Sequence, residues 1–144
     1  MAVNYDAQKA HEYYEKRKQL KGRHSTKGFS KSQKEQWAYA QDQLRQEHKA
    51  IGQSITAESK SIREQLSAAA SQQIESLRTQ LKAMSPEQRK AAKERIQGLI
   101  GTIRERLGLA KQELTTETKQ AREQEKTANE QRIDEAYEHI KGNK

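Results

Sequence analysis

The chain has 144 residues, of which 28 are Lys or Arg and 20 are Asp or Glu, a net charge of +8. It contains no cysteine, which excludes disulfides, thiolate chemistry and metal centres held by cysteine. Leu, Ile, Val and Phe together contribute 20 residues, about 14% of the chain, and a compact core becomes doubtful below ~20%. The composition is therefore typical of disorder or of long helices that bury a narrow apolar seam.

The first predicted element is a short helix over residues 4–21, which carries Tyr5, Tyr13 and Leu20. Gly22 and Gly28 end this helix and bracket a loop. The segment lacks the apolar region of a signal peptide, and no stretch of the chain approaches the ~20 apolar residues of a membrane span. We therefore expect cytosolic synthesis without secretion or membrane insertion. Residues 1–34 form the first predicted unit, a short helix followed by a basic loop.

The charge excess lies in one segment of nineteen residues, from Lys16 to Lys34, which has eight basic residues and no acidic one. The remainder of the chain is balanced, with 20 residues of each sign. Such a concentration indicates a binding site for a negatively charged partner. The alternative is a solvated connector that keeps the protein in solution. The candidate binding residues are Lys16, Arg17, Lys18, Lys21, Arg23, Lys27, Lys31 and Lys34.

A long second helix is predicted over about residues 32–84. Ser32 and Glu35 have the spacing of a capping box at its start. Apolar or small residues between Ile51 and Met84 recur in nine steps over 33 residues, about 3.67 per step. A repeat of this length belongs to helices that are nearly straight or slightly right-handed in their supercoil.

A third helix is predicted to start at Pro86, because Ser85 and Gln88 form a second capping box with proline at the first helical position. Its apolar seam runs from Ala92 to Leu114, fades over residues 115–132, and returns at Ile133, Ala136, Tyr137 and Ile140. The polar stretch is either solvated or covered by other chains in an oligomer. Three glycines within this helix indicate a locally weak helix, or else a close helix approach or a hinge: Gly98, Gly101 and Gly108.

The two long helices match when the chain is folded about Ser85. Residues whose numbers sum to about 173 then oppose each other, so that Ile74 meets Leu99. At the far end, Trp37 and Tyr39 meet Tyr137 and its neighbours. The predicted fold is all-α: a short N-terminal helix followed by a long, coiled-coil-like antiparallel helical hairpin over residues 35–144, with its turn at 84–86.

Enzymatic motifs are missing from this pattern. His11 and Glu12 begin a faint match to the HExxH zinc motif, but Glu15 stands where the second histidine ligand belongs. The sequence shows no Ser/His/Asp set and no phosphate-binding loop of the Walker type. We therefore expect a non-enzymatic protein without a metal or cofactor.

Two binding partners fit the basic segment. In the first hypothesis, its cations neutralise the phosphates of a nucleic acid, and the hydroxyls of Ser25 and Thr26 approach the nucleic-acid backbone. Such binding would tolerate any base sequence, because nothing in the segment reads the bases. The same cations can dock an acidic protein surface. Charge alone does not separate these two hypotheses.

Residues 11–44 and 81–100, and above all the stretch LKGRHSTKG at residues 20–28, resemble small, basic helical proteins encoded among the head and structural genes of tailed bacteriophages. The resemblance implies a phage source, a location in the host cytoplasm or on the virion, and a structural or assembly role. Scaffolding-type proteins of phages are helical and oligomeric, and some hold coat protein through a basic helix–loop–helix clamp, which is the layout of residues 4–34. The resemblance supplies no catalytic residue.

Sequence and resemblance together predict a scaffold-like or virion-associated protein that self-associates through its helical seam. Its basic loop would dock an acidic surface of a phage structural protein. The alternative is a sequence-tolerant nucleic-acid-binding protein, or an anti-defence inhibitor, of phage origin.

Overall fold

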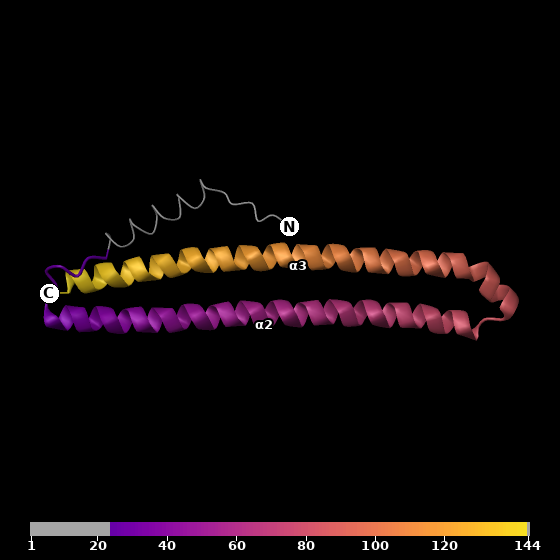
Figure 1. Cartoon of the computed structure of the whole chain (residues 1–144), viewed down its shortest axis with the longest axis horizontal. Helices are drawn as coiled ribbons and strands as arrows, with labels where there is room; N and C mark the ends of the chain where they lie inside the picture. The colour runs from indigo at the N-terminus through magenta and orange to yellow at the C-terminus, as the bar shows by residue number, and fades with distance from the viewer. Residues whose placement is uncertain (1–23, 144) are drawn as a thin grey trace, which may run out of the picture. The chain divides into compact units, whose positions relative to one another are not determined.

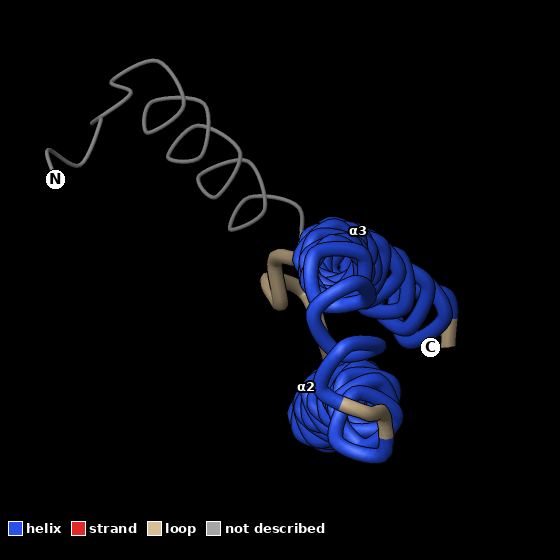
Figure 2. Tube along the Cα trace, turned by 90° about the vertical axis from the view of Figure 1, so that its right-hand side faces the viewer, coloured by secondary structure: helices blue, strands red, loops and turns tan. Residues whose placement is uncertain are grey.

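The computed structural model describes residues 24–143, and among them it contains two helices and no strand (Figures 1 and 2). The helices are α2, Lys31–Ala83, and α3, Pro86–Gly142. The predicted all-α class is confirmed. The predicted helix over residues 4–21 lies outside the described residues. The chain divides into two compact units, His48–Thr127 and Met1–Glu47 with Ala128–Lys144.

Within His48–Thr127, α2 and α3 pack against each other as an antiparallel helical hairpin, and Figure 1 shows them side by side up to their turn. The predicted capping box at the start of α3 is confirmed. The Ser85 N–H donates to Gln88 Oε1 at 3.2 Å, and the Gln88 N–H donates to Ser85 Oγ at 3.3 Å. These reciprocal bonds satisfy backbone donors that the first helical turn leaves without intrahelical partners.

Arg89 of α3 binds the other end of this turn, the C-terminus of α2. Its Nε donates to the Leu81 carbonyl and its Nη2 to the carbonyls of Lys82 and Met84, each at 3.2 Å. The last carbonyls of a helix lack intrahelical donors, and a guanidinium supplies several in a fixed plane. One side chain of α3 therefore caps the C-terminus of α2 and fixes the hairpin turn.

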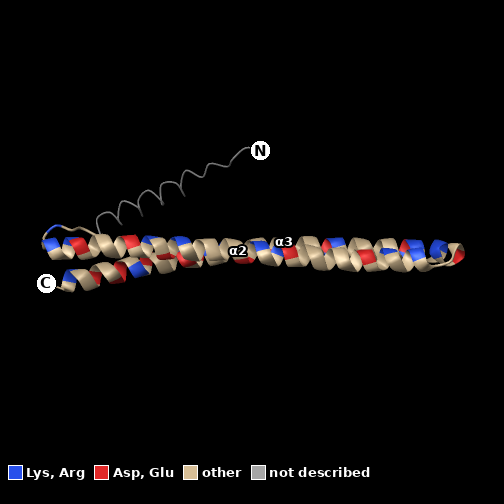
Figure 3. Cartoon of the chain, turned by 90° about the horizontal axis from the view of Figure 1, so that it is seen from below, with Lys and Arg blue, Asp and Glu red and all other residues tan. Residues whose placement is uncertain are grey.

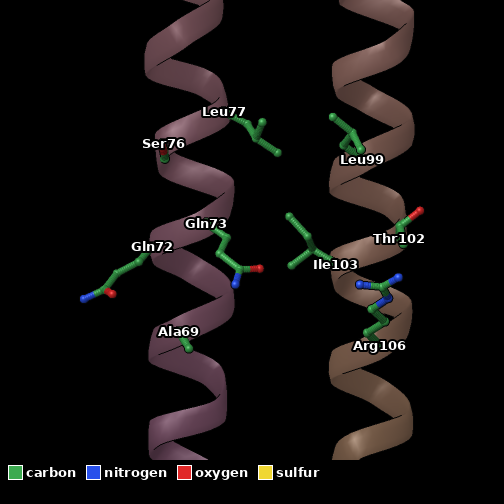
Figure 4. A pocket seen from close by; sticks show the side chains of 9 residues that line it. All are labelled: Ala69, Gln72, Gln73, Ser76, Leu77, Leu99, Thr102, Ile103 and Arg106. Carbon is green, nitrogen blue, oxygen red and sulfur yellow. The ribbon is translucent and has the colours of Figure 1, made fainter.

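The apolar seam of this hairpin is narrow. Its buried hydrophobic residues are Ala70, Ile96 and Leu114, whereas Leu99 remains 45% exposed. Leu99 faces Leu77 across the two helices (Figure 4). The sequence predicted Ile74 as the partner of Leu99. The observed partner, Leu77, lies three residues further along α2, so the predicted pairing of the two helices is shifted by about one helical turn.

Polar side chains join the helices where the seam fades. Thr118 Oγ1 donates to Ser59 Oγ at 3.0 Å, and Arg122 Nη2 donates to Thr56 Oγ1 at 2.9 Å. The residue numbers in these pairs sum to 177 and 178 rather than 173, again a displacement of about one turn. Hydroxyl side chains and one arginine therefore bridge the two helices along the polar stretch.

In the other unit, the start of α2 packs against the end of α3, around Trp37, Tyr137 and Ile140. The capping box of α2 is formed by Ser30 and Gln33, with the Ser30 N–H donating to Gln33 Oε1 at 2.8 Å and the Gln33 N–H donating to Ser30 Oγ at 3.1 Å. The predicted box of Ser32 and Glu35 is wrong by two residues. Both serines have a suitable partner three residues later, but only Gln33 also donates to the Ile140 carbonyl of α3, which favours the box that starts at Ser30.

A candidate docking site for an acidic partner

An aromatic cluster anchors the segment that precedes α2. Trp37 and Tyr137 are both 5% exposed, and their rings meet edge to face with centroids 5.3 Å apart. Phe29 stacks on Tyr137 at 5.6 Å. Trp37 was correctly predicted to meet Tyr137, but the same prediction for Tyr39 is wrong, since 69% of that residue is exposed.

His24 holds the beginning of this segment in place. Its ring lies 5.6 Å from that of Trp37 and 5.0 Å from that of Tyr137. His24 Nε2 also lies 2.7 Å from Asp134 Oδ1, within hydrogen-bond distance. The Tyr137 hydroxyl donates to the Ser25 carbonyl at 2.5 Å. Two consecutive residues of the loop are therefore tied to the last turns of α3.

Gln33 makes a third tie between α2 and the end of α3. It is 6% exposed, and its Nε2 donates to the Ile140 carbonyl at 3.1 Å. The same side chain accepts the Ser30 N–H through Oε1. Both functional groups of the buried amide are thus hydrogen-bonded, which offsets the cost of burying them.

The loop itself turns tightly between Thr26 and Phe29. The Phe29 N–H donates to the Thr26 carbonyl at 3.0 Å, and Gly28 has a φ of +90°. A β-turn with positive φ at its third residue is of type II, and glycine is the residue that adopts it without strain. The turn places Lys27 at an exposed corner.

Replacing Gly28 with alanine should lower the stability of this unit by about 1–2 kcal/mol, because a Cβ makes a positive φ costly. Space is not the cause, since a Cβ at Gly28 would meet nothing within 4 Å. Urea unfolding followed by the fluorescence of Trp37, the one tryptophan of the chain, measures the change. Gly28→Asn should cost less, because asparagine tolerates positive φ. Equal losses in the two variants would contradict this assignment.

The structure describes three of the eight predicted basic residues, and all three are exposed: Lys27, Lys31 and Lys34. Lys16, Arg17, Lys18, Lys21 and Arg23 lie outside the described residues. Lys27 lines a pocket of about 430 Å³ together with Lys141, a residue that the sequence analysis did not select. Lys141 Nζ lies 6.0 Å from the centroid of the Tyr137 ring.

The pocket combines two cations with an apolar wall. Its other lining residues are Ser25, Gly28, Phe29, Gln33 and Tyr137, so no acidic side chain faces it. Elsewhere, basic and acidic residues alternate along α2 and α3 (Figure 3). A carboxylate on a small side chain fits such a pocket, with its charge between the lysines and its stem against the rings.

Two features are missing from the described part of the chain: a cluster of metal ligands and a membrane-spanning helix. Residues 24–143 contain no group of three His, Asp or Glu side chains placed to hold a metal ion. Neither α2 nor α3 has a stretch apolar enough to cross a membrane.

Comparison with known proteins finds no matching family model, no matching curated protein and no matching solved structure. The interpretation of the site therefore rests on its own residues.

Proposed function

We propose that the chain is a non-enzymatic binding and assembly protein that docks an acidic protein surface through residues 16–34. The observation that supports this role is the contrast within residues 24–34. His24, Ser25 and Gln33 are bonded to α3, whereas Lys27 and its two neighbouring lysines stay exposed. A basic segment held on a fixed base loses less conformational entropy on binding than a free linker does.

The biological setting of this proposal comes from the resemblance to phage structural proteins. In that setting the partner is an acidic face of a head or coat protein, and the chain acts as a scaffold-like or virion-associated factor. Self-association through the helices is part of the proposal, since scaffolding proteins act as oligomers.

Reversing the three described lysines tests the docking site. A variant with Lys27→Glu, Lys31→Glu and Lys34→Glu should bind poly-glutamate about tenfold more weakly or worse, because attraction becomes repulsion at one surface. Titration of the fluorescently labelled peptide at 50 mM salt measures the affinity.

The matched control carries Lys82→Glu, Lys90→Glu and Lys93→Glu, three exposed positions that change the net charge equally. It should retain the affinity of the unmodified chain within about threefold. An equal loss of affinity for poly-glutamate in both variants would contradict the proposal, and so would the absence of peptide binding by the unmodified chain.

Nucleic acid is the alternative partner. A gel-shift assay with duplex and single-stranded DNA at 50 and 300 mM salt distinguishes binding to nucleic acid from binding to an acidic protein. Engagement of ~6 phosphates would give a logarithmic salt slope near −5. DNA binding of that kind, lost in the first variant and kept in the second, would replace the acidic protein with nucleic acid as the partner.

A further inference from the structure

The end of α3 is buried on more sides than the rest of the helix. Between residues 128 and 137 only Gln131 and Glu135 are exposed, and residues 128–130 are half-buried in succession. From residue 86 to 127, by contrast, no three consecutive residues are half-buried or buried. Three consecutive residues span about 200° of a helix, whereas the stripe that a helix buries against one neighbour is roughly 100° wide. Packing against α2 alone therefore does not account for this burial.

The described loop before α2 leads away from residues 128–130. His24 is tied to Asp134, and the next residue, Ser25, is tied to Tyr137. The loop therefore runs from Asp134 toward the C-terminus of α3, whereas residues 128–130 lie about one helical turn to the other side of Asp134. The chain that precedes His24 is the segment placed to reach them.

The segment before His24 and this face of α3 have opposite charges. Residues 16–23 contain five basic residues and no acidic one, whereas residues 128–138 contain four acidic residues and one basic residue. Glu130, Asp134 and Glu138 are spaced four apart and share one face of the helix. His24 is tied to this same face through Asp134. Attraction between the two surfaces therefore acts where the chain is already attached.

Asn129, the neighbour of Glu130, offers an acceptor to such a segment. Its Oδ1 is buried and has no hydrogen-bond partner among the described residues. Buried acceptors are nearly always paired, because an unpaired one loses its hydrogen bonds to water. Lysine and arginine side chains carry several donors and no acceptor. A basic segment therefore supplies the donor that this oxygen requires.

We infer that residues 16–23 dock on the face of α3 that carries Glu130 and Asp134 of the same chain. Their length suffices, since eight helical residues rise ~12 Å and Ala128 lies only ~9 Å from Asp134 along α3. This internal contact and an acidic partner compete for the same cations, so the contact is autoinhibitory. The competition rests on the proposed function, whereas the contact itself does not.

A thiol at position 129 tests the contact, because the chain has no cysteine of its own. Reversal of the five basic residues of 16–23 to Glu should speed maleimide labelling of Asn129→Cys about tenfold or more, since the covering segment is then repelled. Gln131→Cys is the matched control, because Gln131 is exposed on the same helix and should react at one rate in both backgrounds. Equal acceleration at both positions, or none at position 129, overturns the inference.

Dilution distinguishes docking within one chain from docking by a second copy. A contact within the chain does not depend on concentration, whereas protection by another copy is lost on dilution. The labelling rate of Asn129→Cys should therefore stay constant over about a hundredfold range of protein concentration. A rate that rises on dilution would overturn the inference, since a second copy would then be the occupant.

Glu130→Lys tests the competition with an acidic partner. It repels residues 16–23 from α3, so it should bind poly-glutamate about threefold more tightly than Glu135→Lys, which makes the same change of charge at an exposed position. Equal affinities of the two variants would overturn the autoinhibition. Absence of peptide binding by the unmodified chain would contradict the proposed function alone, because the labelling rates do not involve the peptide.

Discussion

Replacing Tyr137 with alanine should lower the free energy of unfolding of the unit that contains it by about 3–5 kcal/mol, the usual cost of removing a buried aromatic side chain. Its ring touches those of Trp37, His24 and Phe29, and its hydroxyl donates to the Ser25 carbonyl. Urea unfolding followed by Trp37 fluorescence reports this unit, while circular dichroism follows total helix content. The fluorescence transition should move to lower urea.

Two further variants separate packing from hydrogen bonding. Tyr137→Phe keeps the ring and removes one hydrogen bond, so it should cost about 1 kcal/mol. Tyr39→Ala removes a tyrosine that is 69% exposed, and its effect should stay within about 0.5 kcal/mol. Similar losses for Tyr39→Ala and Tyr137→Ala would show that the cluster does not stabilise this unit.

Loss of Tyr137 should also weaken binding of the acidic peptide, because the loop that carries Lys27 would lose one of its three hydrogen-bonded ties to α3 and the ring on which Phe29 and His24 pack. Under the proposed function, Tyr137→Ala therefore reduces affinity although it removes no charge. Unchanged affinity would mean that the lysines act without the fixed base.

Local chemistry explains the parts of the fold that the sequence predicts well. Ser85, Pro86 and Gln88 specify a helix start within four residues, and the structure contains the expected bonds. The first helix start was harder to place, because Ser30 with Gln33 and Ser32 with Glu35 satisfy the same spacing. Only the contact of Gln33 with the Ile140 carbonyl distinguishes the two, and that contact spans 107 residues.

Helix geometry corrects the prediction for Tyr39. Each residue of a helix is rotated by about 100° around the helix axis, so side chains two residues apart point to nearly opposite sides of the helix. Trp37 and Tyr39 therefore cannot both face α3, and the larger ring is the buried one. Ala40 lies three residues after Trp37, on the same face of α2, and it also packs against the cluster.

The distribution of charge in the sequence identified the basic segment, but it did not identify the side chains that fix this segment to α3 or line its pocket. His24 reads as one more polar residue of the loop, and its partner Asp134 lies 110 positions away. Lys141 reads as an ordinary basic residue in the last turn of a helix. Both acquire a role only when the ends of the helices meet, a long-range effect that periodicity does not encode.

Replacing Gly98, Gly101 and Gly108 together with alanine should stabilise the protein by about 2–3 kcal/mol, since each glycine costs about 1 kcal/mol relative to alanine within a helix. A Cβ at any of the three would meet nothing within 4 Å. Among residues 24–143, this excludes a close helix approach at these glycines, and it leaves a locally weak helix or a hinge as the predictions. Thermal unfolding followed by circular dichroism measures the gain.

The sign of the effect is the informative part. Gly28→Ala should destabilise through its positive φ, whereas the three helical glycines have ordinary helical backbones and open surroundings. A triple variant that is less stable than the unmodified chain would mean that another helix packs closely over this face.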